Sequence, residues 1–227
     1  IHRSISEMVK FVKYFGGNET TVYGLAGLGD LYVSAIGGRN SQMGKYLGQG
    51  TLYKDAKEKF MKDITVEGAQ LALEIGQRLF SQNCAQCHGS DARGATGFPN
   101  LTDKDWLYGG SPDKIKETLL YGRVAAMPSW SAALGEQGVK EMAAHVLSLS
   151  GRTVNQKDAA AGAAKFAMCA ACHGADGKGS VAHNLPFGAP NLTDNIWLYG
   201  GSQRAVEETL NHGRAGVMPA WKEILGE

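Results

Sequence analysis

The feature that most constrains this chain is the five-residue motif C-A-x-C-H, which occurs twice, at residues 84–88 and 169–173. Two cysteines three positions apart lie on one helical turn, so both thiols can form thioethers to the vinyl groups of one haem. The histidine that follows is then placed beneath the iron. A zinc half-site and a redox disulfide are the alternative interpretations, but histidine follows directly in both copies and the motifs use all four cysteines. The motif predicts two covalently attached haems, held by Cys84, Cys87 and His88, and by Cys169, Cys172 and His173.

A longer repeat surrounds each motif. Residues 100–111 and 191–202 agree at ten of twelve positions, and a G-R-x3-M-P-x-W segment follows each stretch. From the asparagine that opens the stretch to the methionine is 27 residues in both copies, whereas from the motif histidine to that asparagine is 12 residues in the first and 18 in the second. Because insertions are tolerated in loops, the six extra residues around 181–187 predict a longer loop in the second copy.

Two of the seven methionines, Met127 and Met218, lie in the duplicated context. Electron-transfer haems commonly pair histidine with a thioether, and the proline after each methionine prevents a helix there and keeps the loop extended. We expect His88, Met127, His173 and Met218 to occupy the axial positions of the two irons, although the spacing does not say which methionine serves which iron. Two filled axial positions favour electron transfer over oxygen or peroxide chemistry. Packing is the expected role of the other methionines, which are Met8, Met43, Met61, Met142 and Met168.

Further residues are expected around each haem. The carbonyls of Pro99 and Pro190 are placed to accept a hydrogen bond from the ligating histidine, and Arg123 and Arg214 are expected at the haem carboxylates. The repeated aromatic residues either line the haem edge or pack in the core, and both interpretations stay open: Trp106, Tyr108, Trp197 and Tyr199. The histidines without a counterpart in the other copy are expected at surface or core positions: His145, His183 and His212. His2, near a chain end, is uninformative.

Taken together, the paired C-A-x-C-H, W-L-Y-G-G-S and G-R-x3-M-P-x-W segments resemble the di-haem region of subunit III of cbb3-type cytochrome c oxidases, over residues 76–227. The resemblance implies an all-α pair of class-I-like cytochrome c domains on the periplasmic side of a bacterial inner membrane. It also implies a donor cytochrome c and haem-copper oxidase subunits as partners. The motif residues match the family's haem positions one by one, and an exchange of methionine ligands between the domains stays open. We expect the domains at residues 76–151 and 158–227, with the polar stretch 151–158 as linker.

Two departures from that family affect the expectations. No apolar run approaches the 18 residues of a membrane span, and the chain begins at Ile1 without a signal peptide, so membrane association is expected only through partner subunits or a missing anchor. The first copy continues through a stretch of helical periodicity at 137–149, whereas the second ends at Glu227, aligned with Glu136. Such a helix normally packs against the N-terminal helix of a small cytochrome. The second domain is therefore expected to be truncated and the weaker of the two.

Residues 1–75 have no counterpart in such a subunit. G-L-A-G-L-G-D-L at 24–31, G-R-N at 38–40 and V-E-G at 66–68 resemble the C-terminal helical domain of NAD-dependent glycerol-3-phosphate dehydrogenase. The resemblance implies that Asp30, Arg39 and Asn40 contact the polyol phosphate, and that Arg39 and Glu67 contact the dinucleotide. A plain helix–helix turn explains the glycine cluster by itself.

No strand followed by a G-x-G-x-x-G loop lies upstream and the expected catalytic lysine is missing, so the chain holds no complete dehydrogenase site. This segment is cytoplasmic in its own family. We therefore expect a foreign or artificial N-terminal segment, with residues 66–80 forming one continuous helix across the join.

Composition narrows the function classes further. The net charge of +1 argues against nucleic-acid binding, and the 31 glycines suit a loop-rich fold wrapped around a cofactor. The leading interpretation is electron transfer through two c-type haems in a cbb3-type oxidase. The alternatives are a fragment or fusion of NAD-dependent glycerol-3-phosphate dehydrogenase, and a soluble di-haem cytochrome c.

Overall fold

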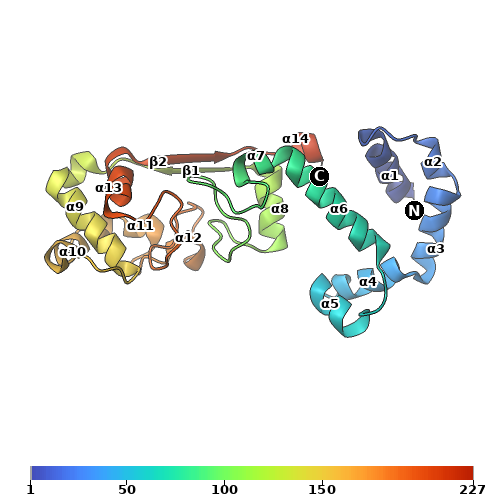
Figure 1. The fold of residues 1–227 in the computed structure, drawn as a ribbon, viewed down its shortest axis with the longest axis horizontal. Coiled ribbons are helices and arrows are strands. Elements are labelled where there is room, and N and C mark those ends of the chain that lie inside the picture. Colours follow the sequence, from blue (N-terminus) through green and yellow to red (C-terminus); the bar gives the residue numbers. More distant parts are fainter. Residues whose placement is uncertain (1, 227) are drawn as a thin grey trace. The chain divides into compact units, whose positions relative to one another are not determined.

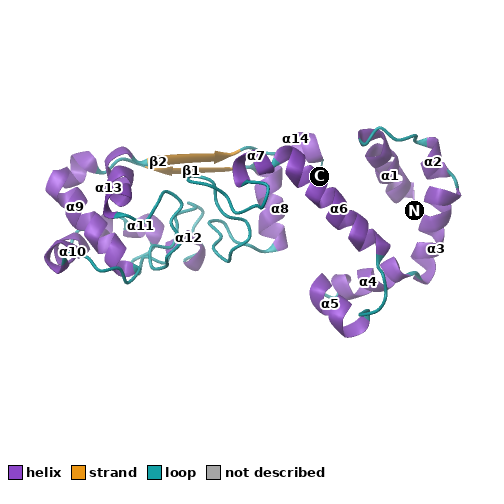
Figure 2. Cartoon of the chain, in the orientation of Figure 1, coloured by secondary structure: helices purple, strands orange, loops and turns teal. Residues whose placement is uncertain are grey.

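The chain divides into two compact units in a computed structural model that describes residues 2–226. One unit runs to Asn83 and the other begins at Cys84. Figure 1 traces both units and Figure 2 shows that helices dominate each of them. None of the described helices is long and apolar enough to cross a membrane.

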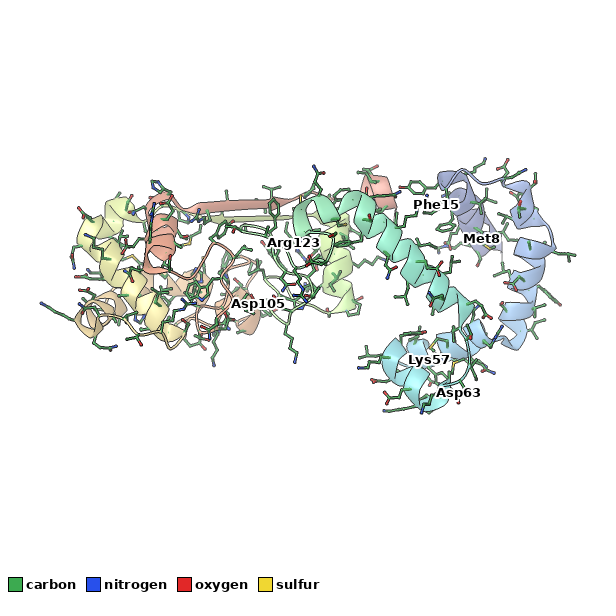
Figure 3. The ribbon with its side chains drawn as sticks, viewed as in Figure 1. Met8, Phe15, Lys57, Asp63, Asp105 and Arg123 are labelled. Carbon is green, nitrogen blue, oxygen red and sulfur yellow. The ribbon has the colours of Figure 1, made fainter. Side chains whose placement is uncertain are left out.

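The first unit is a series of short helices followed by one long one. Its small core is formed by Met43, Ala56, Met61 and Val66. Lys57, labelled in Figure 3, closes the turn after the fifth helix by donating hydrogen bonds to three backbone carbonyls at 2.7–2.8 Å. The elements are α1 (His2–Tyr14), α2 (Thr20–Tyr23), the π-helical turn η1 (Leu25–Gly29), α3 (Asp30–Gly37), α4 (Arg39–Gly48), α5 (Tyr53–Phe60) and α6 (Glu67–Asn83). Since α6 is one unbroken helix, the predicted continuous helix at 66–80 is confirmed from Glu67 onward.

The second unit contains both C-A-x-C-H motifs. Its elements are α7 (Ala85–His88), α8 (Pro112–Tyr121), β1 (Arg123–Met127), α9 (Ser131–Leu149), α10 (Gln156–Ala163), the 3₁₀ turn η2 (Phe166–Met168), α11 (Ala170–His173), α12 (Gly179–Ala182), α13 (Gln203–His212), β2 (Arg214–Met218) and α14 (Lys222–Leu225).

Equivalent positions in the two repeats use the same local devices. Ser111 and Ser202 cap α8 and α13 with their hydroxyl oxygens, and Gly122 and Gly213 end those helices at φ values of 69° and 71°. This left-handed backbone favours glycine and turns the chain directly into the following strand.

The two strands form an antiparallel ladder in which Arg123 pairs with Met218 and Met127 pairs with Arg214. The all-α expectation holds for most of the chain but missed this ladder. Its signal is weak because each strand has only five residues and finds its hydrogen-bonding partner some ninety residues away in the other repeat. Because Arg123 faces Met218 just as Arg214 faces Met127, the ladder relates the repeats by an approximate two-fold symmetry.

Each strand delivers the following backbone to the other repeat. After β1, the Trp130 amide donates to the Leu210 carbonyl of α13 at 2.8 Å, and after β2 the Trp221 amide donates to the Leu119 carbonyl of α8 at 2.8 Å. Figure 1 shows β1 and β2 side by side, with α8 and α14 at one end and α9 and α13 at the other.

Helix α9 covers the second repeat, packing against α10 and α13. The apolar cluster there comprises Val139, Met142, Ala143, Val146, Leu147, Phe166, Cys169, Val206 and Leu210. The helix predicted at 137–149 is present, and it does pack on an N-terminal helix, but on that of the other repeat. Since α9 supplies a packing helix to the second repeat, the stated reason for expecting a weaker second domain does not hold, and the relative stability of the two domains stays a prediction. By contrast, α8 has no buried residue.

Several smaller expectations have clear outcomes. Met43, Met61 and Met142 are buried, as predicted for packing, whereas Met168 is 37% exposed. The predicted linker is shorter than expected, because Asn155 already caps α10. The six extra residues of the second copy form part of α12 and the turn that follows it, rather than a loop throughout. The expected domain boundaries at 75, 151 and 158 stay predictions.

We expect Met142→Ala to lower the free energy of unfolding of the haem-loaded chain by about 2–5 kcal/mol, because it leaves a cavity beneath α9. Hydrogen exchange should then increase mainly in α10 and α13. Lys140→Ala is the matched control on the same helix, since the Lys140 side chain forms an exposed ion pair with Glu136 and its loss should cost less than about 0.5 kcal/mol. Equal loss of protection in α8 would contradict the crossed packing.

Candidate haem sites

The two attachment motifs adopt the same local structure. The amide of His88 donates to the Cys84 carbonyl at 2.9 Å, and the amide of His173 donates to the Cys169 carbonyl at 3.0 Å, so each cysteine pair lies on one helical turn. The first cysteine of each pair is at least partly buried and the second is exposed. Burial, followed by the neighbouring cysteine, raises the pKa of the Cys84 and Cys169 thiols. All four cysteines are free, as attachment to a haem requires.

Both motif histidines are buried and oriented by a proline carbonyl. His88 is 7% exposed and His173 is 8% exposed. With Nδ1 protonated, His88 donates to the Pro99 carbonyl at 2.9 Å and His173 to the Pro190 carbonyl at 3.0 Å, which confirms the predicted partners. This orientation leaves each Nε2 available to ligate an iron, and ligation itself stays a prediction. Burial lowers the pKa of His173 more than the Pro190 carbonyl raises it, which favours the neutral, ligating imidazole.

The proline carbonyls are held in place by tight turns at equivalent glycines. A Cβ at Gly94 would lie 2.2 Å from the Phe98 carbonyl oxygen, and one at Gly179 would lie 2.7 Å from the Asn191 nitrogen. The repeated asparagine then accepts hydrogen bonds from the threonine two residues later, at 2.8–2.9 Å in both copies. The repeated sequence thus fixes the loop that orients the histidine.

The two methionines end the strands and lie toward the repeat opposite their own motif. Met127 packs against the apolar cluster of the second repeat, which includes Cys169. The carbonyl of Met218 passes the end of α8 so closely that a Cβ at Gly122 would lie 2.5 Å from it. The equivalent distance from a Cβ at Gly213 to the Met127 carbonyl is 2.3 Å. These close approaches require glycine at both positions, and they fix the position of the backbone at the end of each strand.

Arg123 and Arg214 occupy equivalent positions beside a tyrosine. The guanidinium carbons lie 4.7 Å from the Tyr108 ring centre and 4.4 Å from that of Tyr199, and both Nε–H groups donate to a threonine hydroxyl at 2.9 Å. Arg123 also pairs with Glu117 at 2.8 Å, and hydrogen bonds from Lys114 and Arg123 lower the pKa of that carboxyl. Figure 3 shows Arg123 and Asp105 in the first repeat.

Two buried donors lack a protein acceptor in the described part of the chain. They are Nη2 of Arg123 and Nε1 of Trp197. Buried N–H groups are costly without a partner, and a haem carries two carboxylates that accept such bonds. The residues present therefore fit a haem in each repeat, with Arg123 and Trp197 available to its carboxylates.

The repeated tyrosines also interlock the repeats. A Cβ at Gly188 would lie 2.3 Å from the Tyr108 hydroxyl, a Cβ at Gly97 would lie 3.4 Å from the Tyr199 ring, and the Gly97 amide donates to the Leu198 carbonyl at 2.9 Å. Asp105 lies near this junction. Burial raises the pKa of its carboxyl, and the charges of Asp194 and Asp103 raise it further. Contact of the four repeated aromatic residues with haem stays a prediction.

The unmatched histidines occupy surface or core positions, as predicted. The ring of His145 packs 5.0 Å from that of Phe166, and burial lowers its pKa. His183 forms a 2.7 Å hydrogen bond with Asp176, and His212 lies at an exposed position beside Glu208.

In the first unit, three of the four dehydrogenase-like residues come together. Arg39 forms an ion pair with Glu67, and the Asn40 side-chain oxygen accepts a hydrogen bond from the Gly68 amide at 2.9 Å. Asp30 lies apart from these contacts, at the start of α3. Their binding roles stay predictions.

The attachment turns and their oriented histidines define the class, which is cytochrome c. Residues 71–146 match the model of the cbb3-type cytochrome c oxidase subunit III family, and residues 159–225 match that of cytochrome c. Residues 1–86 match the NAD-dependent glycerol-3-phosphate dehydrogenase C-terminus. Both resemblances found in the sequence are confirmed, and the matches overlap along α6. The chain thus contains two cytochrome c domains, matched over residues 71–146 and 159–225, which implies covalently bound haem c.

Curated relatives carry the name of the same oxidase subunit. The chain is 56% identical over 150 residues to the cbb3-type cytochrome c oxidase subunit CcoP of Rubrivivax gelatinosus, covering 66% of this chain and 48% of the relative. It is 48% identical over 179 residues to subunit FixP of a Bradyrhizobium species, covering 73% of this chain and 60% of the relative. It is 43% identical over 159 residues to subunit CcoP of Rhodobacter capsulatus, with 64% and 52% covered. The chain thus spans about half the length of the curated relatives it matches.

Replacing Cys84 and Cys87 by alanine should leave a chain with one covalent haem, about 0.6 kDa lighter than the two-haem chain, because each motif fixes one haem. Mass spectrometry after acid–acetone extraction measures this, and the matched Cys169→Ala, Cys172→Ala chain should behave alike. Extraction of all haem from the unaltered chain would contradict thioether attachment.

Proposed function

We propose that the second unit transfers electrons through two haems c, each held between a histidine and a methionine. The observation that carries the proposal is the matched pair of buried histidines, oriented by Pro99 and Pro190, together with a methionine at the end of each strand. Two protein ligands leave the iron no open position, which favours outer-sphere electron transfer over oxygen chemistry.

We further propose that the methionines are exchanged between the domains, so that His88 pairs with Met218 and His173 with Met127. Support comes from the packing of Met127 with the cluster that contains Cys169, and from the crossing of both strands. The hydrogen bonds from Trp130 to Leu210 and from Trp221 to Leu119 hold each post-methionine segment on the receiving repeat.

The protein residues have separate roles in this proposal. A bound haem supplies the reversible one-electron couple of its iron. Pro99 and Pro190 fix the imidazole orientation and raise its basicity as a ligand. The thioether of each methionine favours ferrous iron and so raises the potential. The ladder holds the two domains at a fixed separation, which a relay between two haems requires.

We propose a cbb3-type terminal oxidase as the setting, with a donor cytochrome c supplying electrons and the haem-copper subunits receiving them on the periplasmic side of the membrane. The names of the relatives support this over a soluble di-haem cytochrome c. The first unit is proposed to be a foreign segment without dehydrogenase activity of its own. Its match is to the C-terminal part of that enzyme, and the described strands of the chain form one two-stranded ladder rather than a nucleotide-binding sheet.

The functional test uses the chain reduced under anaerobic conditions. A cbb3 oxidase core depleted of its di-haem subunit should oxidise both haems, followed as loss of the ferrous absorbance, and the reduced chain alone should not bind carbon monoxide. Binding of carbon monoxide by the unaltered chain would indicate an open iron. Stable ferrous haems in the presence of the active core and oxygen would contradict the proposed partner.

The ligand exchange is tested in chains that retain one attachment motif. With Cys84 and Cys87 replaced by alanine, Met127→Ala should abolish the thioether–iron charge-transfer band and Met218→Ala should leave it, because the remaining iron belongs to His173. With Cys169 and Cys172 replaced instead, the two methionine variants should exchange their effects. If each methionine variant removes the band only of the haem in its own repeat, the ligands are not exchanged.

A further inference from the structure

Arg152 is a feature of the second haem site that the duplicated motifs do not include. It lies in the short segment between α9 and α10, which the sequence analysis treated as linker. Its Nη1 donates to the Gly201 carbonyl at 2.6 Å, and its guanidinium carbon lies 5.4 Å from the Trp197 ring centre. Arg152 thus reaches the W-L-Y-G-G-S segment of the second repeat from 49 residues away.

The contact is built closely around a glycine. A Cβ at Gly201 would lie 2.8 Å from Arg152 Nη2 and 2.7 Å from Trp197 Cδ1, so glycine lets the arginine and the indole approach the same turn. The Nε1–H of this indole is one of the two buried donors without a protein acceptor in the described residues. An arginine beside an unsatisfied indole N–H is an arrangement suited to a carboxylate, which accepts from both groups.

The first repeat lacks an equivalent arginine. Trp106 is the counterpart of Trp197, and a Cβ at Gly110 would lie 2.6 Å from its Nε1, so the glycine turn is repeated. Yet within residues 2–226 the only cations placed over a ring are on Phe15, Tyr108, Trp197 and Tyr199, and none is on Trp106. The asymmetry follows from the crossed chain path, because Arg152 reaches the second repeat at the end of α9.

The charge of Arg152 is not neutralised by the protein. Over the described part of the chain it forms no ion pair with a carboxylate, whereas Arg123 in the first repeat is paired with Glu117. The half-exposed Lys114 also pairs with Glu117, so Arg123, Lys114 and Glu117 together carry one net positive charge. Arg214, the equivalent of Arg123 in the second repeat, carries the same charge by itself. Arg152 is therefore an additional positive charge of the second site.

We propose that Arg152 is a positioning residue for the second haem, binding one of its carboxylates together with the indole N–H of Trp197. This inference rests on the proposed function, since it assumes a haem attached at Cys169 and Cys172. A cation at a haem carboxylate offsets the negative charge of that carboxylate. The added positive charge disfavours ferric iron relative to ferrous iron. Arg152 raises the reduction potential of the second haem relative to the same site without it.

The test is a spectroelectrochemical titration of the two-haem chain. Arg152→Gln should move one of the two waves to lower potential, by about a threefold change in the equilibrium constant for a partly solvated charge. That change is about 30 mV, because a tenfold change corresponds to about 59 mV for one electron. Arg152→Lys, which keeps the charge, should retain most of the potential. Arg204→Gln is the matched control, since Arg204 is exposed on α13 of the same repeat.

The affected haem is identified in the chains that keep one attachment motif. Arg152→Gln should lower the potential when only Cys169 and Cys172 are present, and should leave it unchanged when only Cys84 and Cys87 are present. Unmoved waves in Arg152→Gln, even with a loss of stability, would mean that Arg152 only holds the Gly201 turn, and the inference would be overturned. If the unaltered chain has no reversible haem wave, the proposed function itself fails, which is a separate outcome.

Discussion

The antiparallel pairing of β1 with β2 is the interaction on which the rest of the second unit depends. A five-residue strand carries the chain of each repeat across to the other, and a methionine lies at the end of each strand. The strand β1 leads into α9, which packs against α10 and α13, and β2 leads into a segment that contacts α8. The two repeats therefore pack together as one structure and are not independent domains joined only by a linker.

This crossing changes how stability is distributed. The apolar cluster of the second unit forms where α9 meets the second repeat, while α8 of the first repeat buries no side chain fully. Burial of an aliphatic side chain contributes roughly 1.5–3 kcal/mol. The second repeat therefore draws most of its packing energy from a helix that precedes it in the sequence, and the first repeat depends more heavily on its haem and on the ladder.

Sequence reasoning succeeded where the chemistry is local. The attachment turns, the orienting carbonyls of Pro99 and Pro190, and the helix through 137–149 follow from spacings of a few residues that sterics and hydrogen bonding decide. It failed where the answer depends on which copy a segment joins. The hydrophobic periodicity of α9 specifies a buried face, yet both repeats offer an N-terminal helix to bury it. In the structure α9 follows a strand that pairs with the other repeat, and that pairing is a long-range interaction of small residues such as Ala125 and Gly216.

The same distinction explains why Arg152 was not recognised from the sequence. A search for repeated residues finds functions common to both sites, and an arginine in a polar stretch between repeats looks like solvent-exposed linker. Because α9 packs on the second repeat, the segment that joins α9 to α10 lies beside the proposed second haem site. Duplication followed by crossing therefore makes two sites equal in their ligands and unequal in their surroundings. The reduction potential of a haem iron depends on the charges near it as well as on its ligands. Different surroundings therefore allow a repeated protein to bind two haems of different potential with the same ligands.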